Sequence, residues 1–199
     1  FLGIAFLFHT LYILGAGQLH LLPQPQQCIL AKGYFVMGKM RLSTPVLSQE
    51  WKQFVTEMGG TLADQSASSI NIKLIDTIEN IPVNQEEAYR LTITPKTITV
   101  EAVAERGVYW AMQTLFQLKE AGRRNRLQCC TITDWPAFRI RGFMQDVGRS
   151  YLSVEELKRE IAILSRFKIN TFHWHLTENQ AWRLESKIFP MLNDSINMT

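Results

Sequence analysis

The sequence predicts an α+β N-terminal domain followed by the first strands and helix of a (β/α)8 TIM barrel that the chain does not complete (a truncated barrel). Apolar and polar residues alternate in three segments between residues 70 and 102, as in strands with one buried face. Two amphipathic helical patterns flank these segments, which is typical of a mixed domain. After residue 134, a strand, a helix and a second strand occupy about 40 residues, the spacing of a βαβ unit.

Length and composition agree with this division. With 199 residues, of which 46% are hydrophobic, the chain can form one full domain and part of another. Its formal net charge of +3 arises from 21 basic and 18 acidic residues dispersed along the sequence, so no nucleic acid is expected as a partner. The three cysteines describe neither a disulfide framework nor a metal cluster.

Residues 1–16 form an apolar segment with polar interruptions, shorter than the roughly 18 to 20 apolar residues of a membrane-spanning helix. Gly15 and Gly17 provide the small side chains that a signal peptidase needs before its cleavage site. We therefore predict a signal peptide over residues 1–17 and a periplasmic or secreted protein without a membrane anchor. A buried helix is the alternative, and the gene product is expected to begin upstream of Phe1.

Residues 18–133 are predicted to form the α+β domain. A first helix ends at Gly59-Gly60, three strands follow, and the last two strands form a hairpin through Pro95-Lys96. A second helix ends near Gly122. The apolar positions that carry these elements are Leu47, Trp51, Phe54, Val55 and Met58, then Ile70, Ile72, Leu74, Tyr89, Leu91, Ile93, Ile98, Val100 and Ala102, and finally Val108, Ala111, Met112, Leu115 and Phe116.

Residues 134–199 are predicted to begin the barrel. Apolar and small residues on both faces over 138–147 are typical of a buried parallel strand. Ser153 and Glu156 form a capping box that starts a helix, and residues 171–176 form the next strand. Two parallel strands with an intervening helix favour a barrel over an open sheet as our prediction.

Polar residues follow both predicted barrel strands, at the face where the loops of a barrel converge on one pocket. Asp146 and Arg149 follow the first strand, and His175 and Glu178 follow the second. A guanidinium can donate a planar fork of hydrogen bonds to sugar hydroxyls or to a carboxylate, and a glutamate can accept such bonds or orient a histidine. A purely structural salt bridge between Asp146 and Arg149 is the alternative.

His173 and His175 lie two residues apart on a strand and so point to one face, as in barrel amidohydrolases that bind a metal through His-x-His. In those enzymes the pair normally closes the first barrel strand, whereas here a strand and a helix precede it. We expect no metal ligand and no cofactor, and a metal-dependent barrel hydrolase remains the alternative. Trp182 can stack on a sugar ring or belong to the core.

Two segments of the chain closely resemble glycoside hydrolase family 20, the β-N-acetylhexosaminidases. They read RGFMQDVGR over residues 141–149 and KINTFHWHLTENQAWR over residues 168–183, a match long enough to be specific. Leu22-Pro23-Gln24-Pro25 and the helix of residues 107–118 resemble the non-catalytic N-terminal domain of that family. The resemblance therefore covers nearly all of the chain after the predicted signal peptide.

The resemblance implies a retaining, substrate-assisted hydrolysis of terminal β-linked N-acetylglucosamine or N-acetylgalactosamine in oligosaccharides or glycoconjugates. The 2-acetamido oxygen attacks the anomeric carbon, an Asp orients that amide, and the adjacent Glu protonates the leaving oxygen. This catalytic pair belongs to a later barrel strand, so we expect it beyond Thr199 and expect the 199-residue chain alone to be inactive. A non-catalytic carbohydrate-binding protein is the third class of function.

By the same resemblance, Arg149 is expected to bind sugar hydroxyls in the innermost subsite. Glu178 is expected to support the catalytic groups through a histidine that arrives later in the barrel, and His175 and Asp146 occupy supporting positions.

The sequence departs from the family pattern at three positions of these segments. Asn179 stands where a second acid is usual, Ala181 where glycine is common, and Ser150 where a histidine or an aromatic residue often lies. Asn179 removes a charge beside Glu178. Ala181 is unstrained only if its φ is negative.

Overall fold

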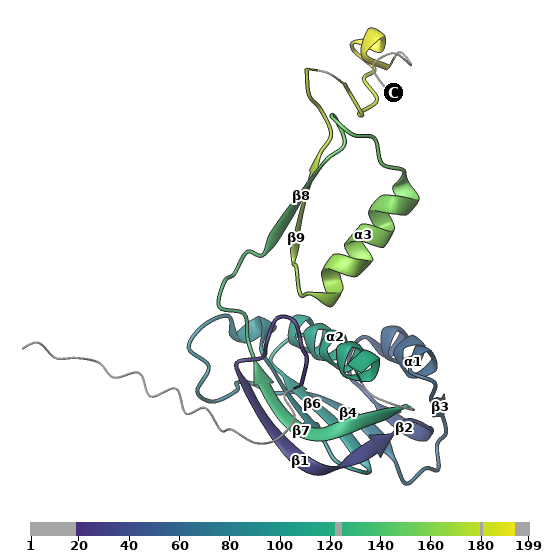
Figure 1. Ribbon diagram of the computed structural model, residues 1–199, viewed down its shortest axis with the longest axis vertical. Helices are drawn as coiled ribbons and strands as arrows, with labels where there is room; N and C mark the ends of the chain where they lie inside the picture. Colours follow the sequence, from purple (N-terminus) through teal and green to yellow (C-terminus); the bar gives the residue numbers. More distant parts are fainter. Residues whose placement is uncertain (1–18, 122–124, 180, 194–199) are drawn as a thin grey trace, which may run out of the picture.

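The computed structural model describes residues 19–121, 125–179 and 181–193 and shows a sheet domain with a βαβ unit beside it (Figure 1). The predicted signal peptide, residues 1–17, lies outside the described residues. None of the described helices combines the length and the apolar character that a bilayer crossing requires.

The sheet domain is built on seven strands in the order β1-β7-β5-β6-β4-β2-β3. Strand β5 pairs antiparallel with both β6 and β7, β1 pairs antiparallel with β7, and β4 runs parallel to β6 and β2. The strands are β1 (Gln27–Val36), β2 (Lys39–Ser43), β3 (Thr61–Leu62), β4 (Ser69–Leu74), β5 (Tyr89–Ile93), β6 (Thr97–Ala102) and β7 (Arg126–Asp134).

Helices α1 (Ser48–Glu57) and α2 (Glu105–Ala121) cover one face of this sheet and separate it from the βαβ unit (Figure 1). The core lies between the sheet and these helices because their apolar stripes face it. Gly107 allows the closest approach: a Cβ there would lie 2.1 Å from the Ala88 carbonyl oxygen. Fully buried core side chains include Trp51, Phe54, Ile70, Leu91, Ile98 and Leu115.

The predicted helices and alternating strands of this domain are confirmed as α1, α2, β4, β5 and β6. The hairpin is confirmed by the register of β5 with β6, which runs from Tyr89↔Ala102 to Ile93↔Ile98. Helix α1 ends at the predicted glycines, and Gly59 has a φ of +77°, a conformation that glycine adopts without strain.

The βαβ unit consists of β8 (Gly142–Asp146), α3 (Val154–Arg166) and β9 (Thr171–His175), and a short helix η2 (Pro190–Asn193) follows. The strands are parallel, with a register from Gly142↔Thr171 to Asp146↔His175. The capping box is confirmed, since Ser153 Oγ accepts a hydrogen bond from Glu156 N at 3.2 Å and Ser153 N donates to Glu156 Oε2 at 2.8 Å.

The prediction of a buried strand over residues 138–147 is wrong in length and in burial. Strand β8 begins only at Gly142, and the side chains of Phe138 and Ile140 are 73% and 72% exposed. Among the described residues, β8 pairs with β9 alone. A strand with a single hydrogen-bonded neighbour leaves much of its surface uncovered, even where its sequence is apolar on both faces.

Candidate active site

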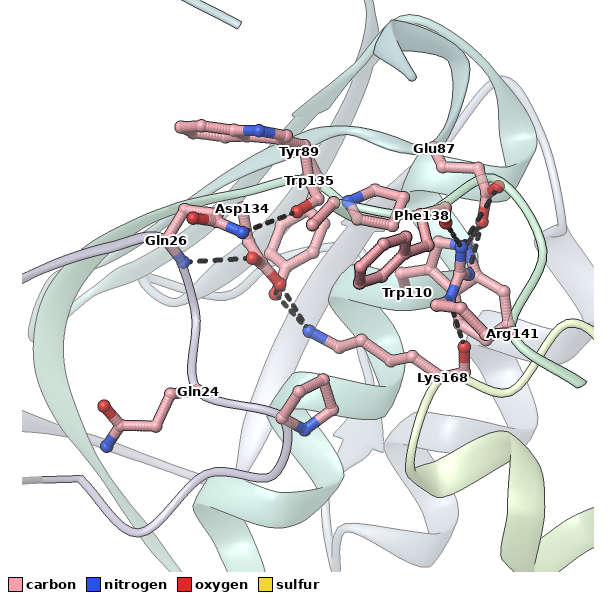
Figure 2. Close-up of a pocket in the computed structure, with 13 residues that line it drawn as sticks. Gln24, Gln26, Glu87, Tyr89, Trp110, Asp134, Trp135, Phe138, Arg141 and Lys168 are labelled. Atoms are coloured by element: carbon pink, nitrogen blue, oxygen red, sulfur yellow. Dashed lines mark hydrogen bonds and ion pairs between the residues drawn. The ribbon is translucent and has the colours of Figure 1, made fainter. Parts of the chain in front are cut away.

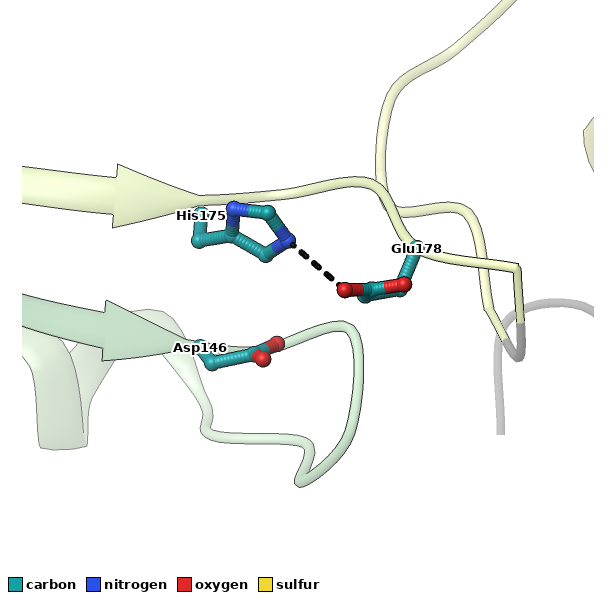
Figure 3. A group of neighbouring side chains, drawn as sticks. All are labelled: Asp146, His175 and Glu178. Atoms are coloured by element: carbon teal, nitrogen blue, oxygen red, sulfur yellow. Dashed lines mark ion pairs between the residues drawn. The ribbon is translucent and has the colours of Figure 1, made fainter.

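The carboxyl ends of β8 and β9 bring four predicted site residues together. Asp146 and His175 are register partners at the last positions of the two strands, and Glu178 lies in the loop after β9, with its carboxylate turned toward His175 (Figure 3). Parallel strands end at the same edge of a sheet, which explains why residues 29 positions apart meet here.

Arg149 joins these groups. Its Nε lies 3.3 Å from Asp146 Oδ2 and its Nη2 lies 3.2 Å from Glu178 Oε1, while its backbone N–H donates to Asp146 Oδ1 at 3.0 Å. Charge-assisted contacts on two sides fix the plane of a guanidinium. The side chain nevertheless remains 66% exposed, and a guanidinium has five N–H donors, more than these two contacts use.

Glu178 is held in its charged form. Its pKa is lowered by the backbone N–H of Asn179, which donates to Oε2 at 3.1 Å, and by Arg149. His175 Nε2 lies 3.6 Å from Glu178 Oε1. Asn179, the departure from the family pattern, thus contributes through its backbone N–H, which any residue except proline could supply.

The loop that carries Glu178 folds back on itself. Thr177 forms an antiparallel bridge with Trp182, and Glu178 N donates to Ala181 O at 2.9 Å. Ala181 is buried within this fold-back. Trp182 is half-buried beside this bridge.

Gly148, to which sequence reasoning assigns no role, lies against this loop. A Cβ at Gly148 would be 3.0 Å from Glu178 Cβ and 3.2 Å from Asp146 Oδ1, tighter than most Cβ contacts in proteins. The absence of a side chain therefore lets the two strand ends approach each other.

The cluster also has the composition of a metal site. Asp146, His175 and Glu178 each offer a ligand atom, and these atoms lie within 4.8 Å of one another. The guanidinium of Arg149, however, already contacts both carboxylates and neutralises part of their charge. His173 does not belong to this group; its ring centroid lies 6.0 Å from that of His175.

A second polar cluster was not predicted. It lies where the βαβ unit meets the sheet domain, beside a cavity of about 190 Å³ (Figure 2). Arg141 pairs there with Glu87, and Lys168 pairs with Asp134, each at 2.6 Å. The signal for it in the sequence was the position of both basic residues shortly before β8 and β9, in the two segments that resemble family 20.

Comparisons with known proteins agree over both parts of the chain. Residues 18–135 match the family model described as "Glycosyl hydrolase family 20, domain 2", and residues 138–197 match "Glycosyl hydrolase family 20, catalytic domain". A β-hexosaminidase of Porphyromonas gingivalis is 42% identical over 118 residues, which are 55% of this chain and 15% of that protein. A β-hexosaminidase of Vibrio furnissii is 41% identical over 114 residues, 57% of this chain and 19% of that protein.

Solved structures give the same result. A family 20 exo-β-N-acetylglucosaminidase of Vibrio harveyi, in complex with N-acetylglucosamine, superimposes with a TM-score of 0.70 at 30% identity, over 87% of this chain and 28% of that one. A β-N-acetylhexosaminidase of Bacteroides fragilis gives 0.68 at 31% identity, over 87% and 36%. The chain thus spans about a third or less of the length of these relatives.

Proposed function

Because the chain belongs to glycoside hydrolase family 20, we propose that it forms part of a β-N-acetylhexosaminidase. The substrate class we propose is an oligosaccharide or glycoconjugate that ends in β-linked N-acetylglucosamine or N-acetylgalactosamine. The observation that carries the proposal is the position of Arg149, which two carboxylates hold at the carboxyl ends of β8 and β9 while most of its side chain stays exposed.

Arg149 would bind the sugar by donating hydrogen bonds to neighbouring hydroxyls. A guanidinium presents its donors in a rigid plane that matches two adjacent oxygens. Asp146 and Glu178 keep that plane fixed before substrate arrives, which reduces the ordering cost of binding. His175 lies against Glu178 and would keep its carboxylate in place.

The chemistry we propose is substrate-assisted, with retention of configuration. The 2-acetamido oxygen attacks the anomeric carbon, and a general acid protonates the leaving oxygen. We assign neither the general acid nor the amide-orienting carboxylate to a residue of this chain, since we expect that Asp-Glu pair on a later strand. The carboxylates of the cluster would add favourable electrostatics for a transition state that is cationic at the sugar ring.

We further propose that residues 18–133 form a non-catalytic domain and that residues 134–199 open a (β/α)8 barrel. The ranges of the two family models and the parallel pairing of β8 with β9 support this division. Export to the periplasm or the outside is proposed from the sequence of residues 1–17 alone.

A metal-dependent hydrolase is the second candidate, because three potential ligand atoms lie within 4.8 Å of one another. The two functions differ in their response to a chelator. Metal removal would abolish turnover by a metallohydrolase, whereas a substrate-assisted glycosidase is expected to retain full activity.

The deciding experiment is turnover of a chromogenic β-N-acetylglucosaminide by the full-length product of the gene that encodes this chain, with and without a chelator. Arg149→Ala is expected to lower kcat/KM at least about 30-fold, since it removes charge-assisted hydrogen bonds to the sugar. Arg106→Ala is the matched control, because Arg106 lies in α2, is 67% exposed and pairs with Glu86 at 3.7 Å rather than with a residue of the site. It should stay within about twofold of the wild type.

Absence of turnover, or equal activity of the two arginine variants, would contradict the proposal. The first result would favour a carbohydrate-binding protein without catalysis. Activity that disappears with the chelator would favour the metallohydrolase.

A further inference from the structure

The βαβ unit is fastened to the sheet domain by an interdomain cluster at the opposite end of β8 and β9 from the candidate active site (Figures 1 and 2). The cluster combines side chains that lie as far as 83 positions apart in the sequence. Its members are Glu87, Tyr89 and Asp134 from the sheet domain and Arg141, Lys168 and Asn170 from the βαβ unit.

Arg141 forms the first half of the cluster. Its Nη2 lies 2.6 Å from Glu87 Oε2, and its Nε donates to the carbonyl oxygen of Lys168 at 2.7 Å. Trp110 Nε1 donates to the same Glu87 oxygen at 2.8 Å. Glu87 is only 5% exposed. Burial raises its pKa, but the hydrogen bonds from Arg141, Trp110 and Asn170 outweigh burial, and the pKa lies below its usual value.

Lys168 forms the second half. Its ammonium is buried, 2.6 Å from Asp134 Oδ2 and 2.9 Å from the Tyr89 hydroxyl. Its backbone φ is +61°, immediately after the end of α3, where a helix usually places glycine. A lysine in this conformation carries strain that glycine would avoid. A lysine at a position that favours glycine indicates that the contacts of its side chain are needed there.

Hydrogen bonds next to Lys168 connect the starts of the two strands. Arg141 N donates to Asn170 Oδ1 at 2.9 Å, and the backbone N–H groups of Asn170 and Thr171 both donate to Arg141 O. Asn170 Nδ2 also donates to Glu87 Oε1 at 3.3 Å. One carboxylate of the sheet domain thus holds the residues that precede both β8 and β9.

These contacts fix which residue of β8 lies opposite which residue of β9. A slip of one position would turn every side chain to the other face of its strand. The register set at Gly142↔Thr171 leads, four residues later, to Asp146↔His175. At about 3.3 Å per residue, the two ends of β8 lie roughly 13 Å apart.

We propose that Glu87 and Asp134 are positioning residues for the active site, although neither lies near it. They seat Arg141 and Lys168 and thereby set the register of β8 and β9. The register in turn places Arg149 between its two carboxylates. The sheet domain, to which the proposed function assigns no catalytic group, would then determine sugar binding through the strands it holds; the activity readout of this idea rests on the proposed function.

The test uses Glu87→Gln in the full-length product, with Glu86→Gln as the matched control. Glu86 is the neighbouring residue, and its ion pair with Arg106 is exposed. Hydrogen exchange of residues 142–146 and 171–175 is measured together with kcat and KM for the chromogenic substrate. We expect Glu87→Gln to speed exchange in both strands at least tenfold and to raise KM at least fivefold. Glu86→Gln should change neither.

A cluster that contributes only to overall stability, and not to the register of β8 and β9, would give a different result. Partial unfolding lowers the amount of active enzyme and so lowers kcat with KM unchanged, and that outcome would overturn the proposal. Exchange in β8 and β9 that matches the Glu86→Gln control would do so as well. Lys168→Arg keeps the charge and is expected to retain a KM closer to the wild type than Lys168→Met does.

The test also covers an insoluble variant and an inactive wild type. If Glu87→Gln yields no soluble protein, Asn170→Ala replaces it. This change removes the hydrogen bonds of the Asn170 side chain with Glu87 and with Arg141 N, and it leaves the ion pair between Glu87 and Arg141 in place. If the wild type shows no turnover, the proposed function has failed, and the exchange of β8 and β9 alone then supports or overturns the positioning role.

Discussion

Adding one methyl group at Gly148 should impair the active site without unfolding the protein. The φ of Gly148 does not lie in the left-handed region, so the backbone tolerates alanine. The new Cβ would lie 3.0 Å from Glu178 Cβ, 3.2 Å from Asp146 Oδ1 and 3.4 Å from Glu178 Cγ. Carbon atoms pack best at about 3.5 to 4.0 Å, so Glu178 must shift by a few tenths of an ångström.

The movement acts on the group that we propose binds the sugar. Glu178 Oε1 lies 3.2 Å from Arg149 Nη2, and a shift of this contact turns the guanidinium away from its prepared orientation. A misplacement of about 1 Å can cost roughly 100-fold in rate, so a shift of a few tenths of an ångström should lower kcat/KM roughly fivefold. The assay is turnover of a chromogenic β-N-acetylglucosaminide by the full-length product.

Gly142→Ala is the control at the other end of β8. Its Cβ would meet Thr171 at 3.8 Å and 3.9 Å, which is ordinary contact, so kcat/KM should remain within about twofold. Wild-type activity of Gly148→Ala would refute the reasoning, and so would equal losses in the two variants.

Three further predictions concern stability. Gly107→Ala should destabilise the protein by about 2 kcal/mol although alanine normally favours helices, because its Cβ would lie 2.1 Å from the Ala88 carbonyl oxygen. Thermal unfolding measures the loss. Gly38→Ala is the control and should unfold like the wild type, because nothing lies within 4 Å of its new Cβ. The lowered pKa of Glu87 implies a contribution to stability that is present above its unfolded value of 4.5 and lost as the pH falls through the lowered pKa. The difference in unfolding free energy between the wild type and Glu87→Gln should therefore shrink in acid, and urea titrations over a range of pH that show a constant difference would contradict this. Ser153→Ala should cost about 1 kcal/mol through loss of the helix cap, visible as faster hydrogen exchange at the start of α3 than elsewhere in the unit.

Periodicity predicted the elements that have one clearly buried face. Strands β4, β5 and β6 alternate in sequence because helices cover one side of the sheet. Strand β1 was not predicted, because nearly all of its side chains are exposed or half-buried and only Phe35 is buried. Its register with β7 also shifts between Leu30 and Tyr34, which interrupts any alternation. Its pairing is fixed by contacts about 100 positions away, which no local pattern contains.

The candidate active site followed from topology, since residues after parallel strands share one edge of a sheet. Asp146, Arg149, His175 and Glu178 meet for that reason. The partners of Arg141 and Lys168 could not be predicted in the same way. Each pairs with an acid of the sheet domain, 54 and 34 positions away, and buried charge pairs depend on packing between domains that local sequence does not describe.

The strand order of the sheet also constrains how the chain can assemble during synthesis. Strand β7, the last of the sheet domain to be made, lies between β1 and β5, so the sheet cannot close before residue 134 has left the ribosome. Asp134, the acceptor for Lys168, is the final residue of that strand. Because domains fold as units from the N-terminus, the sheet domain can complete its fold before the βαβ unit is made, and Glu87 and Asp134 are then in place when Arg141 and Lys168 are added.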